Sequence, residues 1–403
     1  MAAVNEPRLV ALRGGLGTVP GVRLAGVHAG IKKRKRDLAV IAFDAPQVCA
    51  SVITTNEIKA APLLVSREHI AKNGSAMRAL VCNSGCANAC TGERGERDAR
   101  ATARQAAALL DLPAHAIVIA STGVIGVPLQ MDRMQKGLER AVTDLESGGE
   151  AAFDAAEAIM TTDRVPKLAA YAFYEGNKRY VVAGIAKGSG MIAPNMATML
   201  AFIATDAPMS QQALQRELSA CTDATFNMIS VDGDMSTNDA VYAFAPAGET
   251  QAPAHFGAAL RRLCDDLAQA MVADGEGATK TLTVTVTGAA SEQQARVIAR
   301  SVINSNLVKT ALFGEDPNWG RIIAAAGAAR AGLDPQRWSL HLNGELWVDV
   351  GSIEVLSEAE AHRELEHTAV SVHLNLGLGN ACATGWGCDL SRDYVKINAS
   401  YRT

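Results

Sequence analysis

Apolar positions recur along the chain at two spacings, one typical of helices and one typical of strands. Helical spacing occurs in the Ala-rich segment 97–110 and in residues 131–145 and 260–271. Short apolar or alternating runs, typical of strands, occupy residues 38–43, 116–120, 180–186 and 282–286. Because the two patterns alternate along the chain, we expect an α/β (or α+β) protein built of packed layers.

The chain is too long for one ordinary core, since 403 residues correspond to two or three domains. No repeat or low-complexity linker marks a border. The strand pattern near residue 285 suggests a main domain of residues 1–285 and a smaller one of residues 286–403. Two predicted strands run into glycine-containing segments, Ser121-Thr122-Gly123 and Gly188-Ser189-Gly190, and we expect the first of these to be a turn.

Composition and charge exclude several classes of protein. With 48% hydrophobic and 20% charged residues and a net charge of -4, the chain has no electrostatic footprint for nucleic acid or an anionic membrane. The basic run 32–36 is expected to be a solvated turn. There is no spanning apolar segment, no secretory signal pattern and no disulfide framework among the eight cysteines. A cytoplasmic location is therefore expected.

Common catalytic and binding motifs are absent from the sequence. The glycine-rich stretches at 184–190, 274–280 and 377–385 lack the spacing of a dinucleotide fingerprint or a P-loop. Cys82, Cys86 and Cys90 recur every four residues, but no second cysteine pair or spaced histidines complete a zinc site. The G-x-S-x-G elbow of serine hydrolases is also missing. We therefore expect no metal and no cofactor.

The segment 187–201 remains the strongest candidate for chemistry. Small residues flank Ala197 and Thr198, so backbone and substrate can approach closely, and Pro194 prevents a strand from simply continuing. A glycine-rich junction between a strand and a helix would explain the same residues without any chemistry. Spacing alone leaves both interpretations open.

Motifs across nearly the whole chain resemble those of the ornithine acetyltransferases, also called bifunctional glutamate N-acetyltransferases. The central one, K-G-S-G-M-I-A-P-N-M-A-T-M-L (187–200), resembles that family's self-processing segment. The others follow in family order: C-N-S-G-C-A-N-A-C-T-G (82–92), S-T-G-V-I-G (121–126), M-T-T-D (160–163), S-V-D-G-D-M-S-T-N-D (230–239), D-G-E-G-A-T-K (274–280), G-E-D-P-N-W-G-R (314–321) and N-A-S-Y-R-T (398–403).

The resemblance implies that the chain cuts itself between Ala197 and Thr198, giving an α chain of residues 1–197 and a β chain of residues 198–403. The Thr198 hydroxyl would attack the Ala197 carbonyl, and water would release a new N-terminus. That α-amine has a reference pKa of about 7.7 to 8.0, so Thr198 would supply both nucleophile and base.

The resemblance also implies a reaction in arginine biosynthesis. The acetyl group of N2-acetyl-L-ornithine would pass to Thr198 and then to L-glutamate, with Thr122 (side chain) and Gly123 (backbone N–H) forming the oxyanion hole. Lys187 suits a substrate carboxylate and Glu276 a substrate ammonium. The full set of substrate-binding residues implied is Thr161, Thr162, Lys187, Thr198, Glu276, Asn398 and Thr403, with a slight preference for Thr162 over Thr161.

Further expectations follow from the same resemblance. The fold should be a layered α-β-β-α sandwich with a smaller C-terminal α/β domain, assembled as α2β2. Neither nucleic acid nor membrane is an expected partner. Whether acetyl-CoA is a second acetyl donor, which separates bifunctional from monofunctional members, is left open by these motifs.

Two alternatives compete with this interpretation. A self-cleaving N-terminal threonine or serine aminopeptidase would use the same nucleophile but let water resolve the acyl-enzyme. A binding homologue would keep the fold without cutting or catalysing, but Thr198, Thr122, Gly123 and Lys187, whose loss would mark it, are all present.

Overall fold

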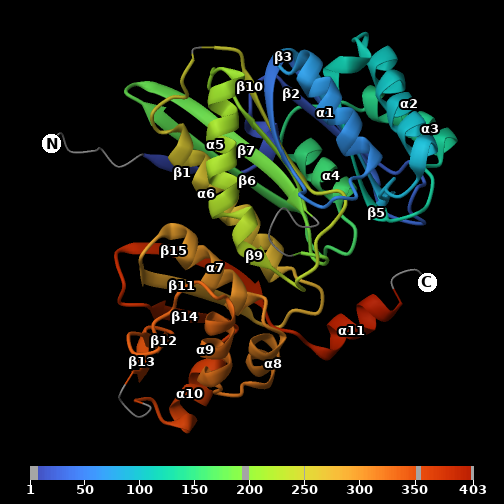
Figure 1. Ribbon diagram of the computed structural model, residues 1–403. Coiled ribbons are helices and arrows are strands. Elements are labelled where there is room, and N and C mark those ends of the chain that lie inside the picture. Colours follow the sequence, from blue (N-terminus) through green and yellow to red (C-terminus); the bar gives the residue numbers. More distant parts are fainter. Residues whose placement is uncertain (1–7, 193–198, 249, 351–354, 401–403) are drawn as a thin grey trace. The chain divides into compact units, whose positions relative to one another are not determined.

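The computed structural model describes residues 8–192, 199–248, 250–350 and 355–400. The chain divides into two compact units, each assembled from separate stretches of sequence (Figure 1). The first unit takes its described residues from Met1–Gly188, Thr198–Thr222 and Ser236–Leu267. The second takes them from Ser189–Ala197, Asp223–Met235 and Ala268–Thr403.

The first unit contains a large sheet and the helices that cover it. Its strands are β1 (Leu9–Ala11), β2 (Val22–Val27), β3 (Leu38–Ile53), β4 (Met77–Cys86), β5 (Ile117–Val124), β6 (Lys167–Glu175), β7 (Lys178–Lys187), β8 (Leu200–Thr205) and β10 (Ala240–Pro246). Its helices are η1 (Gly15–Thr18), α1 (Ala61–Asn73), α2 (Gly92–Leu110), η2 (Ala114–Ala116), α3 (Met131–Thr143), α4 (Gly149–Ile159), α5 (Gln211–Ala224) and α6 (Phe256–Ala273), the last two of which continue into the second unit.

The long strand β3 belongs to both halves of this sheet. The strand order is β1-β6-β7-β8-β10-β3-β4-β5, with β2 also paired to β3. Residues 38–42 pair with β4, residues 47–53 pair with β10, and the register shifts between them. The three residues at the shift, Asp44, Ala45 and Pro46, are exposed. An interruption of this kind bends a strand, and it lets one sheet fold into two layers.

Four layers result from this bend. The inner core lies between the two sheet layers and joins side chains of β2–β5 with those of β6–β8, β10 and α4. Alanines of α2 and apolar residues of α3 cover the outer face of the β2–β5 layer. Figure 1 shows α5 and α6 across the other layer, where Leu267 of α6 lies against Gly184 of β7. The α-β-β-α sandwich is therefore confirmed.

The edge of the sheet at β5 is protected by α1. The Ser66 hydroxyl donates to the Ile119 carbonyl at 2.6 Å and accepts from the Ile119 N–H at 2.8 Å. His69 Nδ1 lies 2.8 Å from the Ile117 carbonyl oxygen. Side chains thus take up edge groups that would otherwise be unpaired, which holds the strand carrying Thr122 and Gly123 in place.

The second unit is a helix-covered sheet of its own, with strand order β13-β12-β14-β11-β15-β9. Alternate residues of β11, Leu282, Val284 and Val286, are buried against the helices, as the strand period predicts. The elements are η3 (Phe226–Met228), β9 (Ile229–Ser230), β11 (Thr281–Ala289), α7 (Glu292–Ile303), α8 (Asn306–Gly314), α9 (Trp319–Ala328), β12 (Ser339–Leu342), β13 (Glu345–Asp349), α10 (Glu358–Leu365), β14 (Ala369–Asn375), β15 (Ala381–Cys388) and α11 (Arg392–Ala399).

The domain border differs from the one expected from sequence. The expected border at 285/286 falls inside β11, which pairs with β14 on one side and β15 on the other. A strand in that position cannot be divided between domains, so the second unit begins earlier, at Ala268 within α6. It also recruits residues 223–235, whose strand β9 pairs with β15.

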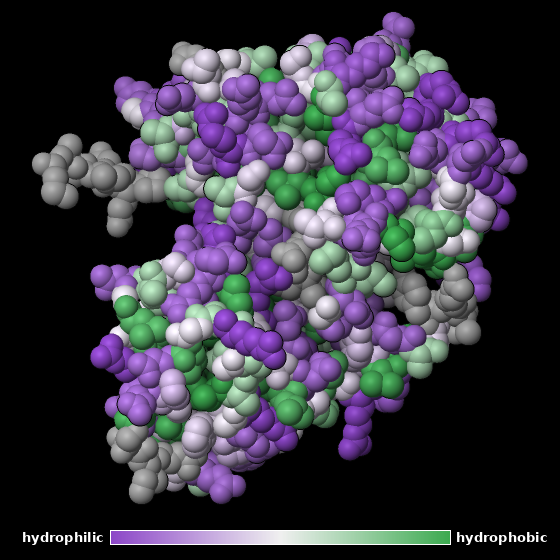
Figure 2. Space-filling model, viewed as in Figure 1, coloured by the Kyte–Doolittle hydropathy of each residue, from purple (hydrophilic) through white to green (hydrophobic). Residues whose placement is uncertain are grey.

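Several local predictions also change in length. The strand expected at 116–120 runs on to Val124, so Ser121-Thr122-Gly123 is the end of a strand and not a turn. It continues because β4 pairs with it through Gly85. In the basic run, Lys33, Arg34 and Lys35 are exposed as expected, whereas Lys32 and Arg36 are half-buried. Over α2 and α3 the surface is largely hydrophilic (Figure 2).

No helix within the described part of the chain is long and apolar enough to cross a membrane.

Candidate active site

Lys187 and Thr122 meet in the first unit although 65 residues separate them in sequence. Both are buried, and Lys187 Nζ donates to Thr122 Oγ1 at 3.4 Å. In a flat sheet β7 and β5, with four strands between them, would lie about 24 Å apart. The bend in β3 therefore brings the ends of two distant strands together.

Gly123 lies where no other residue fits. Its φ is +129°, and a Cβ there would be 2.4 Å from the carbonyl carbon of Gly85, its partner in β4. A side chain would push β4 and β5 apart at the point where Thr122 reaches Lys187. The two glycines thus allow a close pairing of backbones, which leaves Thr122 and Gly123 at the rim of the strand layer.

Asp163 connects the M-T-T-D segment to the end of β7. Its Oδ1 accepts from the Gly188 N–H and from Lys167 Nζ, both at 2.7 Å, and its Oδ2 accepts from the Thr161 N–H at 3.0 Å. Burial alone would raise the pKa of this carboxyl, but the ammonium groups of Lys187 and Lys167 and the Thr161 N–H lower it to about 2. Asp163 is a permanent anion that fixes the residues on both sides of it.

Asp163→Asn is expected to destabilise the first unit by about 3–5 kcal/mol at neutral pH, because Lys167 would stay buried without its counter-charge. The pKa of Asp163 in the folded protein lies below the ordinary aspartate value of 3.8, so the stabilisation is present above pH 4 and is lost as pH falls. About 1 kcal/mol should be lost by pH 3.

Urea unfolding at pH 6 and pH 3 measures both effects, with Asp144→Asn as the control, since Asp144 is exposed beside Arg140. A stability difference between wild type and Asp163→Asn that stays constant with pH would contradict this assignment.

Thr161 and Thr162 both lie in this segment and both are half-buried. The Thr161 backbone is held by Asp163, which orients the turn as a whole. Burial does not separate the two threonines, so the choice between them stays a prediction.

Two residues of the S-V-D-G-D-M-S-T-N-D motif hold backbone on either side of the site. Asn238 Nδ2 donates to the carbonyl of Ser121, next to Thr122, at 2.8 Å. Asp239 Oδ1 accepts from the N–H of Met199 at 2.9 Å, and Met199 in turn accepts from the Ala240 N–H. Ala197 and Thr198 lie outside the described residues, but Met199 directly follows Thr198 in the chain.

Asp239 is fully buried, and its Oδ2 has no hydrogen-bond partner among the described residues. Burial raises the pKa of this carboxyl well above its usual range, against the opposing effects of the Met199 N–H and the Lys187 ammonium. No role for Asp163, Asn238 or Asp239 was predicted from the sequence. Their position within motifs that resemble those of the ornithine acetyltransferases was the only sign in the sequence that they could matter.

Glu276 and Asn398 contact each other in the second unit. Asn398 Nδ2 donates to Glu276 Oε2 at 2.8 Å, and the Glu276 N–H donates to the Ser189 carbonyl at 2.7 Å. A Cβ at Gly190 would lie 2.4 Å from the Glu276 carboxyl carbon. Gly190 therefore allows the backbone to pass directly over this carboxylate.

The residues just before the expected cleavage point are held by Asp232. Its Oδ1 accepts from the Ile192 N–H at 2.7 Å, and its Oδ2 accepts from the Met191 N–H and from the Tyr394 hydroxyl at 3.3 Å. Burial raises the pKa of the Tyr394 hydroxyl, and the nearby Asp232 carboxylate raises it further. Helix α11, which carries Tyr394 and Asn398, is thereby linked to this segment. Thr403 lies outside the described residues.

The cysteines considered for a metal do not converge. Cys82 faces the inner core and Cys86 the outer core, because the register of β4 shifts at Gly85. Within the described residues there is no group of three or more His, Cys, Asp or Glu side chains that could hold a metal ion.

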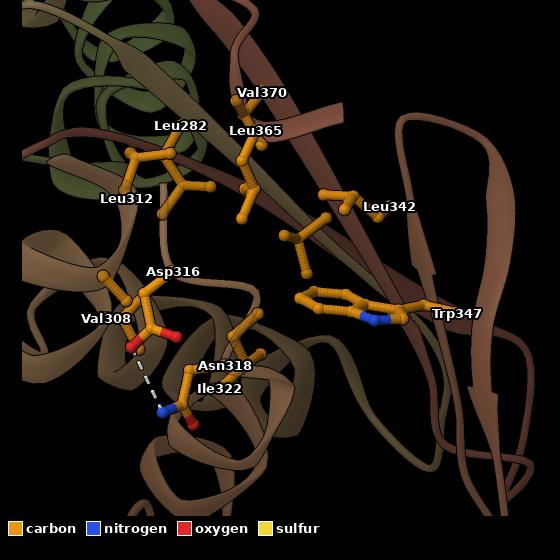
Figure 3. Close-up of a pocket in the computed structure, with 12 residues that line it drawn as sticks. Leu282, Val308, Leu312, Asp316, Asn318, Ile322, Leu342, Trp347, Leu365 and Val370 are labelled. Atoms are coloured by element: carbon orange, nitrogen blue, oxygen red, sulfur yellow. Dashed lines mark hydrogen bonds between the residues drawn. The ribbon is translucent and has the colours of Figure 1, made fainter. Parts of the chain in front are cut away.

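The G-E-D-P-N-W-G-R motif lies at a small apolar cavity of the second unit (Figure 3). Asn318 caps α9 by accepting from the Arg321 N–H, and its amide donates to Asp316 at 3.3 Å. The cavity, about 20 Å³, has room for about one water molecule. This motif therefore builds the junction of α8 and α9.

Comparison with known proteins agrees with this arrangement of motifs. The chain matches the ArgJ family over residues 23–403. It is 43% identical over 398 residues to the arginine biosynthesis bifunctional protein ArgJ of Bacillus anthracis, covering 97% of both chains. It is 47% identical to the protein of that name from Symbiobacterium thermophilum, covering 97% of this chain and 99% of the relative.

A solved structure is similar to about half of the chain. The crystal structure of ornithine acetyltransferase complexed with ornithine from Mycobacterium tuberculosis is 38% identical over 47% of this chain and 99% of that chain, with a TM-score of 0.43. Because the family match covers residues 23–403 and the relatives match along 97% of the chain, this protein belongs to the ArgJ family.

Proposed function

We propose that this protein is a glutamate N-acetyltransferase of arginine biosynthesis that acts through an N-terminal threonine. It moves the acetyl group of N2-acetyl-L-ornithine to L-glutamate and releases L-ornithine and N-acetyl-L-glutamate. The observation that carries the proposal is the contact between the buried side chains of Lys187 and Thr122, with Gly123 next in the strand, in the first unit. This group combines a cation with potential oxyanion donors at the end of the strand that leads toward Thr198.

In the first half-reaction the Thr198 hydroxyl attacks the acetyl carbonyl, and its proton passes to the Thr198 α-amine. The Thr122 hydroxyl and the Gly123 N–H stabilise the oxyanion. The C–N bond then breaks, ornithine leaves with the proton on its α-nitrogen, and an acetyl ester stays on Thr198. In the second half-reaction the α-amine of glutamate attacks that ester and restores the free hydroxyl. One amide replaces another, so the reaction needs neither ATP nor a metal or cofactor.

The same nucleophile matures the chain by cutting between Ala197 and Thr198, which gives chains 1–197 and 198–403. Support comes from the backbone next to this segment, which is held by one aspartate on each side. Asp232 accepts the N–H groups of Met191 and Ile192, and Asp239 accepts the N–H of Met199. Each aspartate holds backbone within its own unit, and limiting the conformations of backbone near the reacting bond favours attack by a neighbouring residue.

Asp239→Ala should slow self-cleavage by about tenfold, since a lost hydrogen bond is worth about 1.4 kcal/mol. Uncut chain would accumulate and could be followed by intact mass spectrometry during expression. Asp234→Ala is the matched control, because Asp234 is exposed in the same motif. Equal cutting rates in wild type and Asp239→Ala would remove Asp239 from this account.

Substrate binding is assigned by family resemblance to Thr161, Thr162, Lys187, Thr198, Glu276, Asn398 and Thr403. Lys187 is buried and cationic, which suits the α-carboxylate that both substrates carry. The Glu276 carboxylate, oriented by Asn398, suits the side-chain ammonium of ornithine. An α2β2 assembly and a cytoplasmic location complete the proposal, and acetyl-CoA is a candidate second acetyl donor.

Ornithine release separates the proposal from its rivals. Purified protein is given N-acetylornithine with and without glutamate, and ornithine and N-acetylglutamate are both measured. An acetyltransferase releases ornithine continuously only with glutamate, and in equal amount to N-acetylglutamate. A hydrolase of the aminopeptidase type releases it without glutamate, and a binding homologue releases none.

A further inference from the structure

Lys32 is a half-buried lysine that the proposed mechanism does not use. The sequence predicted a solvated turn, but only Lys33, Arg34 and Lys35 of the basic run are exposed. Asp37, fully buried, accepts the Lys32 N–H at 2.8 Å and so fixes the backbone of the turn. The Lys32 side chain is directed inward as a result.

The surroundings of Lys32 are those of the candidate site. Its Nζ donates at 3.1 Å to the carbonyl of Met160, the residue before Thr161. Its stem packs on Gly85, where a Cβ would lie 2.9 Å from Lys32 Cγ, and Gly85 is the strand partner of Gly123. The Lys32 side chain therefore runs from Gly85, the strand partner of Gly123, to Met160, which precedes Thr161.

The charge on Lys32 is held weakly. Burial lowers the pKa of Lys32 to about 8. The Asp37 carboxylate opposes this shift most strongly, while the positive charge of Lys35 adds to it. Glu157 and Asp163 oppose it more weakly. Asp163 is already engaged with Lys167 and two N–H groups. Among the described residues Lys32 has a carbonyl partner but no carboxylate within ion-pair distance. It is available for a charged ligand.

We propose that Lys32 is a specificity-determining residue, whose ammonium form binds the side-chain carboxylate of glutamate and whose neutral form accommodates the side-chain ammonium of N-acetylornithine. This inference rests on the proposed function. The two substrates share an α-carboxylate, for which Lys187 suffices, and their side chains end in groups of opposite charge. A lysine that exchanges its proton with solvent near neutral pH meets both requirements.

The test compares two acceptors that differ in that carboxylate alone. Acetyl transfer to glutamate and to glutamine is measured between pH 6.5 and 9.5 with the self-cleaved protein. Both acceptors react through an α-amine of similar basicity, so its titration cancels in the ratio of their kcat/KM values. As pH rises through about 8, wild type should lose preference for glutamate, by about tenfold at pH 9 relative to pH 7.

Three variants separate charge from structure. Lys32→Met should lower kcat/KM for glutamate at least about tenfold at pH 7, mainly through KM, and should make the ratio independent of pH. Lys32→Arg keeps the charge, so the preference should persist to pH 9.5 while the KM for N-acetylornithine rises. Lys33→Met, on an exposed neighbour, should behave as wild type.

Certain outcomes would overturn the inference. One is a wild-type ratio that stays flat with pH. Another is a Lys32→Met variant that loses activity equally with glutamate and glutamine, which would indicate a structural role. Failure of the proposed function is distinguishable, because wild type would then form no N-acetylglutamate at any pH.

Discussion

Replacing Thr198 by alanine is expected to leave the chain in one piece and to abolish acetyl transfer. One hydroxyl attacks the Ala197 carbonyl during maturation and the acetyl carbonyl during turnover, so its removal stops both reactions. Loss of a catalytic nucleophile lowers turnover by about 10⁴-fold or more. The activity that remains comes from substrate binding and oxyanion stabilisation. No other substitution in the chain should have so large an effect.

Intact mass spectrometry under denaturing conditions measures the first consequence. Wild type should give two fragments, the second beginning at Thr198, and Thr198→Ala a single full-length species. Thr198→Ser is the matched control, since it keeps a hydroxyl and should still cut. If wild type itself stays uncut, the binding-homologue interpretation takes over. If Thr198→Ala is cut at the same bond, another nucleophile is at work.

The layered fold could be predicted from the sequence because it depends on local periods. The alternation at Leu282, Val284 and Val286 and the helical spacing at 260–271 both correspond to the elements found. The bend in β3 could not be predicted, because residues 44–46 look like the end of a strand. That strand continues only because β10 pairs with its second half.

The border of the units was misplaced for a related reason. Residues 223–235 belong with the second unit only because β9 pairs with β15, more than 150 positions further along the chain. Strand pairing over such a distance leaves no trace in composition or periodicity, so a border drawn from sequence follows chain order instead.

The candidate site was predictable where motifs carried it and not where burial did. Thr122, Gly123 and Lys187 follow from family resemblance, and the structure places them together in the first unit. Lys32 and Asp163 were missed, since charged residues in polar loops are usually solvated. Asp163 is buried and Lys32 half-buried because a backbone N–H or carbonyl of a distant segment is the partner of each.

Thr122→Val should lower kcat by about 100- to 1,000-fold, the usual cost of losing one oxyanion-hole donor. Valine keeps the shape of threonine and suits a strand, so β5 should be retained. Gly123 keeps its N–H, and this second donor accounts for the activity that remains. Thr122→Ser, which keeps the hydroxyl, should retain most activity and serves as the matched control.

The distribution of that loss between kcat and KM decides what the hydroxyl does. A donor that acts on the oxyanion is used only in the transition state, so kcat should fall while KM for N-acetylornithine stays near the wild-type value. If the hydroxyl instead serves to hold Lys187, whose Nζ lies 3.4 Å away, a displaced ammonium would weaken substrate binding and KM would rise. A kcat within about tenfold of wild type, with an increased KM, would transfer the oxyanion role from Thr122 to Gly123 and leave Thr122 as the support of Lys187.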